Sequence, residues 1–153
     1  MKKELLNEVA IRLLSLSVNE GVARSMVSSA VATLDPTIEE WSDIRCAVSE
    51  AVTNCIVHAY RQTQGVIYIS VKLYADRIIQ IEVRDKGCGI ADVKEARQPL
   101  FTTDREGERS GMGFSVMETF MDTLKVYSRV GKGTRVVMQK RLSKSDGRRK
   151  ISG

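Results

Sequence analysis

The stretch SEAVTNCIVHAY, from Ser49 to Tyr60, decides how the rest of the chain is interpreted. Its apolar residues continue a helical stripe that begins upstream. On a helical wheel Glu50, Asn54 and His58 lie at about 0°, 40° and 80°, whereas the stripe is centred near 165°. The three polar side chains therefore share one side of the predicted helix, away from its buried side. The stripe consists of Trp41, Ile44, Val48, Val52, Cys55 and Ala59.

A polar row on a helix has two explanations. The simpler one is a face that is solvated and carries no function. However, Glu50 and Asn54 are one turn apart, so a carboxylate and an amide oxygen lie side by side. Such a pair can hold a hard cation or orient a proton acceptor. The helix by itself leaves both explanations open.

Size and composition indicate one soluble globular domain. The chain has 153 residues, of which 42% are hydrophobic and 28% charged. No apolar run reaches the roughly 20 residues of a membrane span, and acidic residues interrupt any signal-peptide core near the N-terminus. The three cysteines, at 46, 55 and 88, lack CxxC spacing and predict neither a disulfide framework nor a zinc site. We expect a cytoplasmic protein without a membrane partner.

The net charge of +5 belongs to the C-terminal end. Residues 140–153 carry six basic residues and one acidic residue, so their net charge equals that of the whole chain. The body before them is balanced. We therefore divide the chain into a domain at 1–142 and a basic, disordered tail at 143–153. A solubilising tail is the simpler interpretation, and a nonspecific contact with a polyanion is the alternative.

Periodicity predicts an α+β sandwich of two layers. A strand at 8–17 precedes a helix at 19–34 that is capped by Asn19, and Asp35 and Pro36 are expected to start the long helix that ends near Tyr60. Alternation then predicts a strand pair, and further helices and a hairpin follow. We expect the helices on one face of a mixed, mostly antiparallel sheet. The later segments are strands 66–74 and 78–84, a short helix 93–97, a polar loop 100–111, a helix 111–124, and strands 125–130 and 134–142.

The segment RDKGCGI, from Arg84 to Ile90, is the second group of candidate functional residues. It places Asp85 at the end of a strand and glycines at Gly87 and Gly89. The glycines remove side chains where the chain turns and where a flat group could approach the backbone. An ordinary glycine turn with an aspartate cap remains the alternative.

The third group is ERSGMGF, from Glu108 to Phe114. Ser110 can cap a helix that Gly111 and Gly113 open, and free N–H groups at a helix N-terminus favour a phosphate, as does the charge of Arg109. A plain helix start is the alternative. The chain contains neither GxxxxGK[ST] nor GxGxxG, so a nucleotide must be held in another way.

The order of these motifs is more specific than any one of them. ExxxN on a helix, DxGxG after a strand, a Thr-bearing loop, GxG opening a helix and GT before a last strand resemble the Bergerat-fold ATP-binding superfamily. SEAVTNCIVHAY, EARQPLFTTDREGERSGMGF and NEGVAR are similar to the bacterial anti-sigma F factors, which are serine protein kinases. The similarity covers roughly residues 5–145. The length of the chain leaves no room for the transducer domain of a gyrase or MutL subunit.

This resemblance implies a role for each motif residue. It makes Glu50 the general base, Asn54 a magnesium ligand, and Asp85 the acceptor of a hydrogen bond from the adenine amino group. It also makes Arg24 a contact for a protein partner. The remaining implied ATP or ADP contacts are Gly87, Gly89 and Thr134 at the base, Ser110, Gly111 and Gly113 at the phosphates, and Thr102, Thr103 and Arg109 in a lid over the γ-phosphate.

The resemblance also implies a function. A homodimer would bind and inhibit a sporulation sigma factor of RNA polymerase, and would use ATP and Mg²⁺ to phosphorylate a serine of an anti-anti-sigma factor. One alternative is the same kind of kinase serving a stress-response sigma factor. Another is an ATP-dependent binding module without kinase activity. A nucleic-acid-binding module acting through the tail is the third, although we expect no specific nucleic-acid partner.

Overall fold

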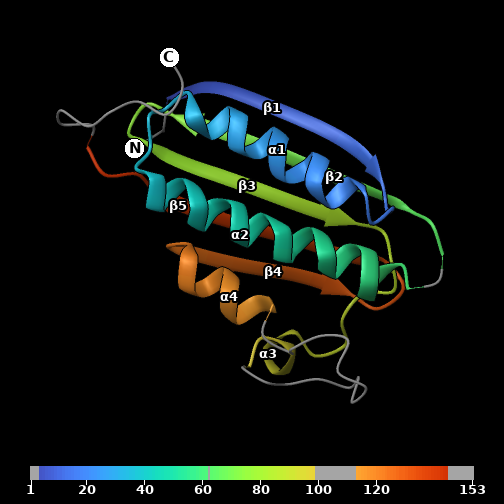
Figure 1. The fold of residues 1–153 in the computed structure, drawn as a ribbon. Coiled ribbons are helices and arrows are strands. Elements are labelled where there is room, and N and C mark those ends of the chain that lie inside the picture. The colour runs from blue at the N-terminus through green and yellow to red at the C-terminus, as the bar shows by residue number, and fades with distance from the viewer. Residues whose placement is uncertain (1–3, 62, 99–112, 145–153) are drawn as a thin grey trace.

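A single five-stranded sheet forms one layer of the protein. The computed structural model describes residues 4–61, 63–98 and 113–144 (Figure 1). The strand order is β1-β2-β3-β5-β4, and each neighbouring pair is antiparallel. The strands are β1 (Leu5–Leu14), β2 (Val66–Tyr74), β3 (Ile78–Asp85), β4 (Thr123–Arg129) and β5 (Gly133–Arg141).

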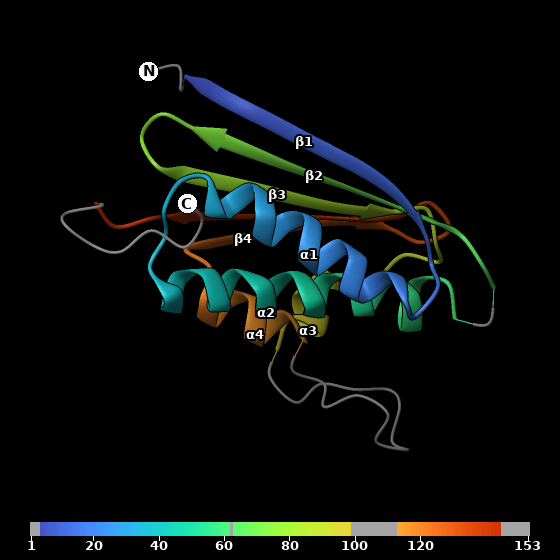
Figure 2. The same cartoon turned by 45° about the horizontal axis from the view of Figure 1, so that its top comes forward.

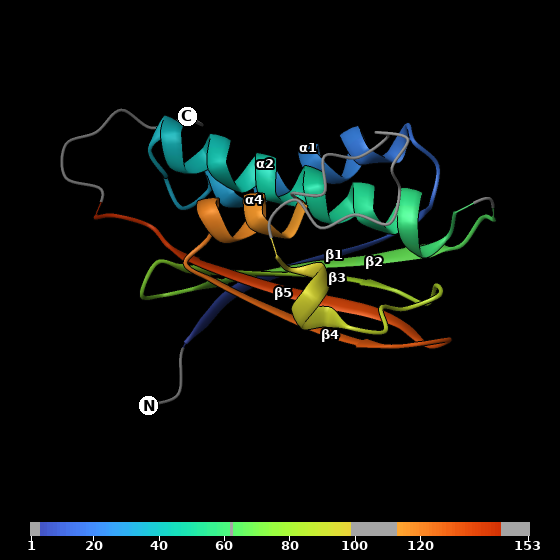
Figure 3. The ribbon, with the colours of Figure 1, turned by 90° about the horizontal axis from the view of Figure 1, so that it is seen from below.

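Helices form the second layer, on one face of the sheet. Figures 2 and 3 show α1, α2 and α4 over the same face. The predicted α+β sandwich is therefore confirmed, with a sheet that is antiparallel throughout the described residues. No helix in this part of the chain has the length and apolarity needed to cross a membrane. The helices are α1 (Asn19–Ala32), α2 (Ile38–Asn54), the π-helix η1 (Cys55–Ala59), α3 (Val93–Ala96) and α4 (Gly113–Phe120).

The core lies between the two layers, where the period-two alternation of β2 and β3 predicted it. The inward residues of both strands are almost completely buried, and they pack against the inward stripes of α1 and α2. Burying one such side chain stabilises a fold by about 1.5–3 kcal/mol. The sheet-side residues are Ile67, Ile69, Val71, Leu73, Ile79, Ile81 and Val83, and their helical partners include Val27, Val31, Ile44, Val48 and Val52.

The predicted start of the long helix is wrong by two residues. Thr37, not Asp35, is the N-cap of α2. The Thr37 hydroxyl accepts a hydrogen bond from the N–H of Glu40, and the Glu40 carboxylate accepts one from the N–H of Thr37. This is a capping box, T-x-x-E, which satisfies two backbone donors at once. Asp35 instead turns the chain, with a φ of 55°.

Further boundaries differ from the prediction. The first strand, predicted at 8–17, is β1 at Leu5–Leu14, so it begins and ends earlier than its partial alternation indicated. Asn19 is the first residue of α1 rather than its cap, because its amide donates a hydrogen bond to the carbonyl of Leu14 in the preceding strand. The helix predicted at 111–124 ends at Phe120, and Leu124 is buried from β4. The apolar pattern of that segment continued without a break because helix and strand both bury it against the same core.

Candidate active site

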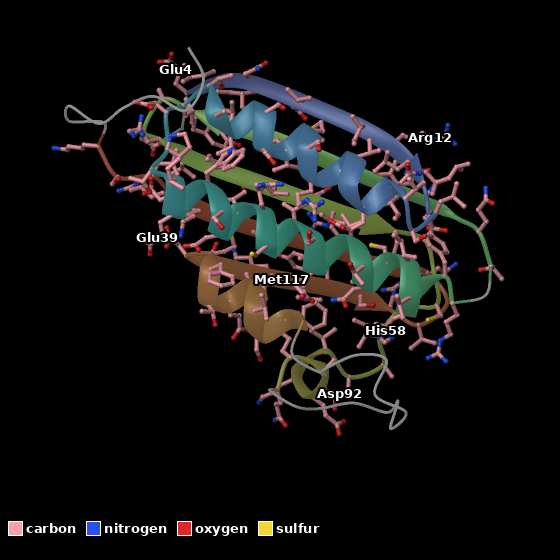
Figure 4. The ribbon with its side chains drawn as sticks, viewed as in Figure 1. Glu4, Arg12, Glu39, His58, Asp92 and Met117 are labelled. Atoms are coloured by element: carbon pink, nitrogen blue, oxygen red, sulfur yellow. The ribbon has the colours of Figure 1, made fainter. Side chains whose placement is uncertain are left out.

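A cavity of about 460 Å³ opens at one end of the two layers. The last turn of α2, η1, the loop after β3, α3, the start of α4 and β5 surround it. Figure 4 shows His58 at the end of the long helical segment, next to the loop that carries Asp92. The polar and small residues that line the cavity include Asn54, Cys55, His58, Asp85, Gly113 and Thr134.

Two of the sequence motifs meet at Gly113. A Cβ placed on Gly113 would lie 3.2 Å from both the Oδ1 and the Nδ2 of Asn54, and 3.4 Å from Oε2 of Glu50. Glu50 and Asn54 therefore both point from α2 toward the first residue of α4. The sequence predicted that they share a side of the helix, but not that α4 faces that side. The absence of a side chain at position 113 leaves room in front of the carboxylate and the amide.

Asp85 lies in the wall of the cavity and is 5% exposed. Its Oδ1 accepts hydrogen bonds from the N–H of Gly87 at 2.9 Å and of Thr134 at 3.2 Å. Burial raises the pKa of Asp85 above its usual value, although these N–H groups and the thiol of Cys55 act in the opposite direction. The cavity thus contains a carboxylate that is held in a fixed orientation by backbone donors.

The loop after β3 needs its glycines for close packing. A Cβ on Gly87 would lie 2.3 Å from the carbonyl oxygen of Ala59, and one on Gly89 would lie 2.2 Å from that of Arg129. Gly89 also has a φ of 77°, which favours glycine. The two glycines therefore let the loop fit between η1 and the β4–β5 turn, which fixes Asp85 at its start.

Sequence reasoning missed Ser128, which supports Thr134. The hydroxyl of Ser128 lies 2.8 Å from that of Thr134 and accepts a hydrogen bond from the N–H of Ile90 at 2.7 Å. It thereby joins β4, β5 and the glycine loop. The register of the hairpin, in which Ser128 pairs with Thr134, was the signal that could have identified it.

Tyr60 is a second missed residue. Its hydroxyl accepts a hydrogen bond from the N–H of Lys86 at 2.7 Å and donates one to the carbonyl of Val66 at 2.6 Å. Gly65 packs directly on the tyrosine ring, where a Cβ would lie 2.1 Å from a ring carbon. Tyr60 thus links the end of η1 to the residue after Asp85.

Arg24 lies on α1, away from the cavity lining. Its guanidinium forms an ion pair with Glu20 at 3.1 Å and donates a hydrogen bond to the hydroxyl of Ser49 at 3.4 Å. The side chain is 37% exposed. Because Ser49 precedes Glu50, this network connects the surface of α1 to the part of α2 that carries the candidate base.

Five of the predicted contacts lie outside the described residues. They are Thr102, Thr103, Arg109, Ser110 and Gly111, which the resemblance places at the phosphates and in the lid. Their roles stay predictions. Cys46, Cys55 and Cys88 are all free cysteines.

Comparison with known proteins identifies the family of the chain. The profile of the histidine kinase-like ATPase domain family matches residues 6–140. An anti-sigma F factor of Caldanaerobacter subterraneus subsp. tengcongensis is 55% identical over 139 residues, which are 91% of this chain and 96% of that protein. An anti-sigma F factor of Clostridium perfringens is 50% identical over 137 residues, which are 90% of this chain and 98% of that protein.

Solved structures support the fold. The RsbU and RsbW domains of a Mycobacterium tuberculosis protein match with a TM-score of 0.67 at 20% identity, covering 90% of this chain and 33% of that one. The catalytic domain of the histidine kinase ThkA matches with a TM-score of 0.53 at 14% identity, covering 90% and 97%. From its sequence and its fold, the chain belongs to the histidine kinase-like ATPase domain family and, within it, to the anti-sigma F factors.

Proposed function

We propose that the protein is an ATP-dependent serine kinase and an anti-sigma factor. It binds and inhibits a sporulation sigma factor of RNA polymerase in the cytoplasm, where sigma factors act, and phosphorylates a serine of an anti-anti-sigma factor. The observation that carries the kinase part is the convergence of Glu50, Asn54 and Gly113 beside a cavity that also contains Asp85. The family of the chain supports the anti-sigma part.

Glu50 is the general base in this proposal. The serine hydroxyl of the acceptor gives its proton to the carboxylate of Glu50 as its oxygen attacks the γ-phosphorus of ATP, and the bond to the leaving ADP breaks. Glu50 also faces the start of α4 rather than open solvent, and a Cβ on Gly113 would lie within 3.4 Å of its Oε2. The closeness of Gly113 to the carboxylate supports a site that must admit an acceptor and a phosphoryl group.

Asn54 is the protein ligand for Mg²⁺. Among the described residues, no group of three or more His, Cys, Asp and Glu side chains could hold a metal ion. The amide oxygen of Asn54 is a donor that fits Mg²⁺, which proteins commonly bind through one or two oxygen ligands together with phosphate oxygens and water. When bound, the ion would neutralise charge on the phosphates, and the amide oxygen of Asn54 would be its ligand from the protein.

Asp85 recognises the base of the nucleotide by a hydrogen bond. Its Oδ1 is occupied by the N–H groups of Gly87 and Thr134, so Oδ2 is the oxygen that can accept a hydrogen bond from the amino group of adenine. The hydroxyl of Thr134, held by Ser128, adds a second polar group on the same wall. The cavity volume of about 460 Å³ is within the range of small-molecule sites.

In this proposal the protein partner binds at α1, and the protein forms a homodimer through a neighbouring surface. Arg24 contacts the protein partner with the part of its guanidinium that Glu20 and Ser49 leave exposed. The dimer forms at the end of β1 and the start of α1, where apolar side chains are exposed beside an edge strand. These side chains are Leu14, Leu16, Val18 and Val22.

The test mixes the full chain with a sporulation sigma factor, the anti-anti-sigma protein and ATP labelled in its γ-phosphate. We expect a complex with the sigma factor that the anti-anti-sigma protein disrupts, and label on a serine of the latter. If the complex with the sigma factor forms in the presence of ATP but no label is transferred, a binding module is favoured over a kinase. Transfer of label by a protein that forms no complex with the sigma factor would contradict the anti-sigma assignment.

A further inference from the structure

The thiol of Cys55 is among the polar side chains of the cavity that have no role in the proposed reaction. Cys55 is the first residue of η1, where the helix widens into a π turn, and it is only 4% exposed. Single π turns within helices are frequent at functional sites. The sulfur lies 3.4 Å from Oδ2 of Asp85, and both residues line the cavity.

The two oxygens of Asp85 have different partners. Oδ1 accepts two backbone N–H groups, which fill its two lone-pair positions. Within the described part of the chain, the donor to Oδ2 is the thiol of Cys55, which is a weak donor. The second lone-pair position of Oδ2 therefore remains available to a donor on a ligand.

The thiol is enclosed, and its sulfur is within hydrogen-bonding distance of Oδ2 of Asp85. Burial, followed by the negative charge of Asp85 and the hydrogen bond to it, raises the pKa of Cys55 well above its usual value. A thiol in such surroundings is a fixed donor and not a nucleophile. It also favours the ionised form of Asp85, and so opposes the larger effect of burial, which raises the pKa of that carboxyl.

We propose that Cys55 is a positioning residue whose thiol holds Oδ2 of Asp85 directed into the cavity, and thereby sets the preference for a nucleotide whose base carries an exocyclic amino group. The inference rests on the proposed nucleotide site. A carboxylate oxygen held in this direction accepts a hydrogen bond from an amine and repels a carbonyl oxygen. Cys55 thus favours adenine over hypoxanthine, which has a carbonyl at the same ring position.

The experiment measures the dissociation constants of ATP and of inosine triphosphate by calorimetry on the full chain. The variants are Cys55→Ala, Cys55→Val, which retains volume but no donor, and Cys55→Ser, which retains a donor. We expect the preference for ATP to fall about tenfold in the first two, comparable to the loss of one hydrogen bond to a charged group, and to be kept by serine. Cys46→Ala, at an exposed cysteine of α2, is the matched control and should bind like wild type.

Two outcomes overturn the inference. The first is an unchanged ATP preference in either Cys55→Ala or Cys55→Val, whichever folds as judged by thermal unfolding. The second is a Cys55→Ser variant that loses the preference as fully as alanine. A wild-type protein that binds neither nucleotide would instead overturn the proposed function. If wild type binds ATP and Asp85→Asn weakens that binding, the nucleotide site stands, whatever Cys55 does.

Discussion

At the scale of single residues, Asp85 has the most constrained surroundings in the cavity. One of its oxygens accepts two backbone N–H groups and the other faces the thiol of Cys55. An acceptor fixed in this way is prepared for a ligand donor and needs no rearrangement when one binds. Two tests at this scale separate binding of the base from chemistry at the phosphates.

Asp85→Asn should weaken ATP binding. The substitution removes the charge that accepts the ligand amine and costs about 1.5–3 kcal/mol, or roughly 10- to 100-fold in the dissociation constant. Because burial raises the pKa of Asp85 above its usual value, wild-type affinity should decline with falling pH sooner than an ordinary aspartate would allow. Titration calorimetry across pH checks both effects. A pH dependence that persists unchanged in the variant would contradict the role of Asp85.

Gly113→Ala should separate activity from stability. Alanine is a better helix former than glycine by about 1 kcal/mol, so α4 should not be destabilised. The new Cβ would press on the side chains of Asn54 and Glu50, and phosphate transfer should fall at least tenfold. Thermal unfolding and a transfer assay measure the two effects. Gly21→Ala in α1, where a Cβ meets no atom closer than 3.8 Å, is the control and should leave transfer unchanged.

Sequence reasoning predicted the elements that carry Glu50, Asn54 and Asp85, because each residue is tied to a regular period or to the end of a strand. Their roles stay predictions. Sequence reasoning missed Ser128 and Tyr60, whose importance depends on contacts between segments far apart in the chain. The hydroxyl of Tyr60 makes hydrogen bonds with the backbones of Val66 and Lys86. The helical period indicates only that this end of the helix has an apolar side, and does not indicate these partners. Such contacts arise from the packing of the layers and leave no local pattern.

At the scale of elements, the site depends on how η1 meets the loop after β3. The N–H of Cys88 donates to the carbonyl of Ala59 at 3.0 Å, and Gly87 allows the two backbones to approach. The period predicted one helix as far as Tyr60 but not its change to a π turn. The start of α2 was predicted wrongly for a different reason. The sequence contains the capping-box pattern T-x-x-E at Thr37, but the Asp-Pro pair at residues 35–36 was taken as the helix start instead.

Tyr60→Phe should loosen this junction. It removes the acceptor of the Lys86 N–H and the donor to the Val66 carbonyl, and should cost about 1–3 kcal/mol of unfolding free energy. ATP affinity should decline as well, because Lys86 follows Asp85. Chemical denaturation and calorimetry provide the two measurements. Tyr127→Phe, at an exposed tyrosine of β4, should change neither, and an equal loss in both variants would argue against a specific junction.

At the scale of the whole molecule, the strand order leaves β1 at one edge and β4 at the other. The fold class could be predicted because the alternation of β2 and β3 is regular and each helix has one apolar side. The pairing of β4 with β5 was predicted as a hairpin and is confirmed. The pairing of β3 with β5 could not be predicted, since it joins residues as far apart in the chain as Asp85 and Thr134. The boundary expected at residue 142 stays a prediction.

The exposed apolar side chains at the β1–α1 junction predict a homodimer that charge should disrupt. Replacing Leu14 and Val22 together by lysine should convert a dimer to a monomer in sedimentation, because two lysines would have to be buried without partners. Val130→Lys is the control, since Val130 is also exposed but follows β4. A monomeric wild type, or a double variant that remains dimeric, would rule out this interface.

The most direct test of the central claim, that Glu50 is the base of a serine kinase, is single-turnover phosphate transfer by Glu50→Gln with ATP affinity measured on the same samples. The account predicts a dissociation constant for ATP close to that of wild type. It predicts that transfer to the anti-anti-sigma serine falls by about 10²–10⁴-fold, the usual contribution of a positioned base. Transfer at the wild-type rate, with ATP bound equally well, would contradict it.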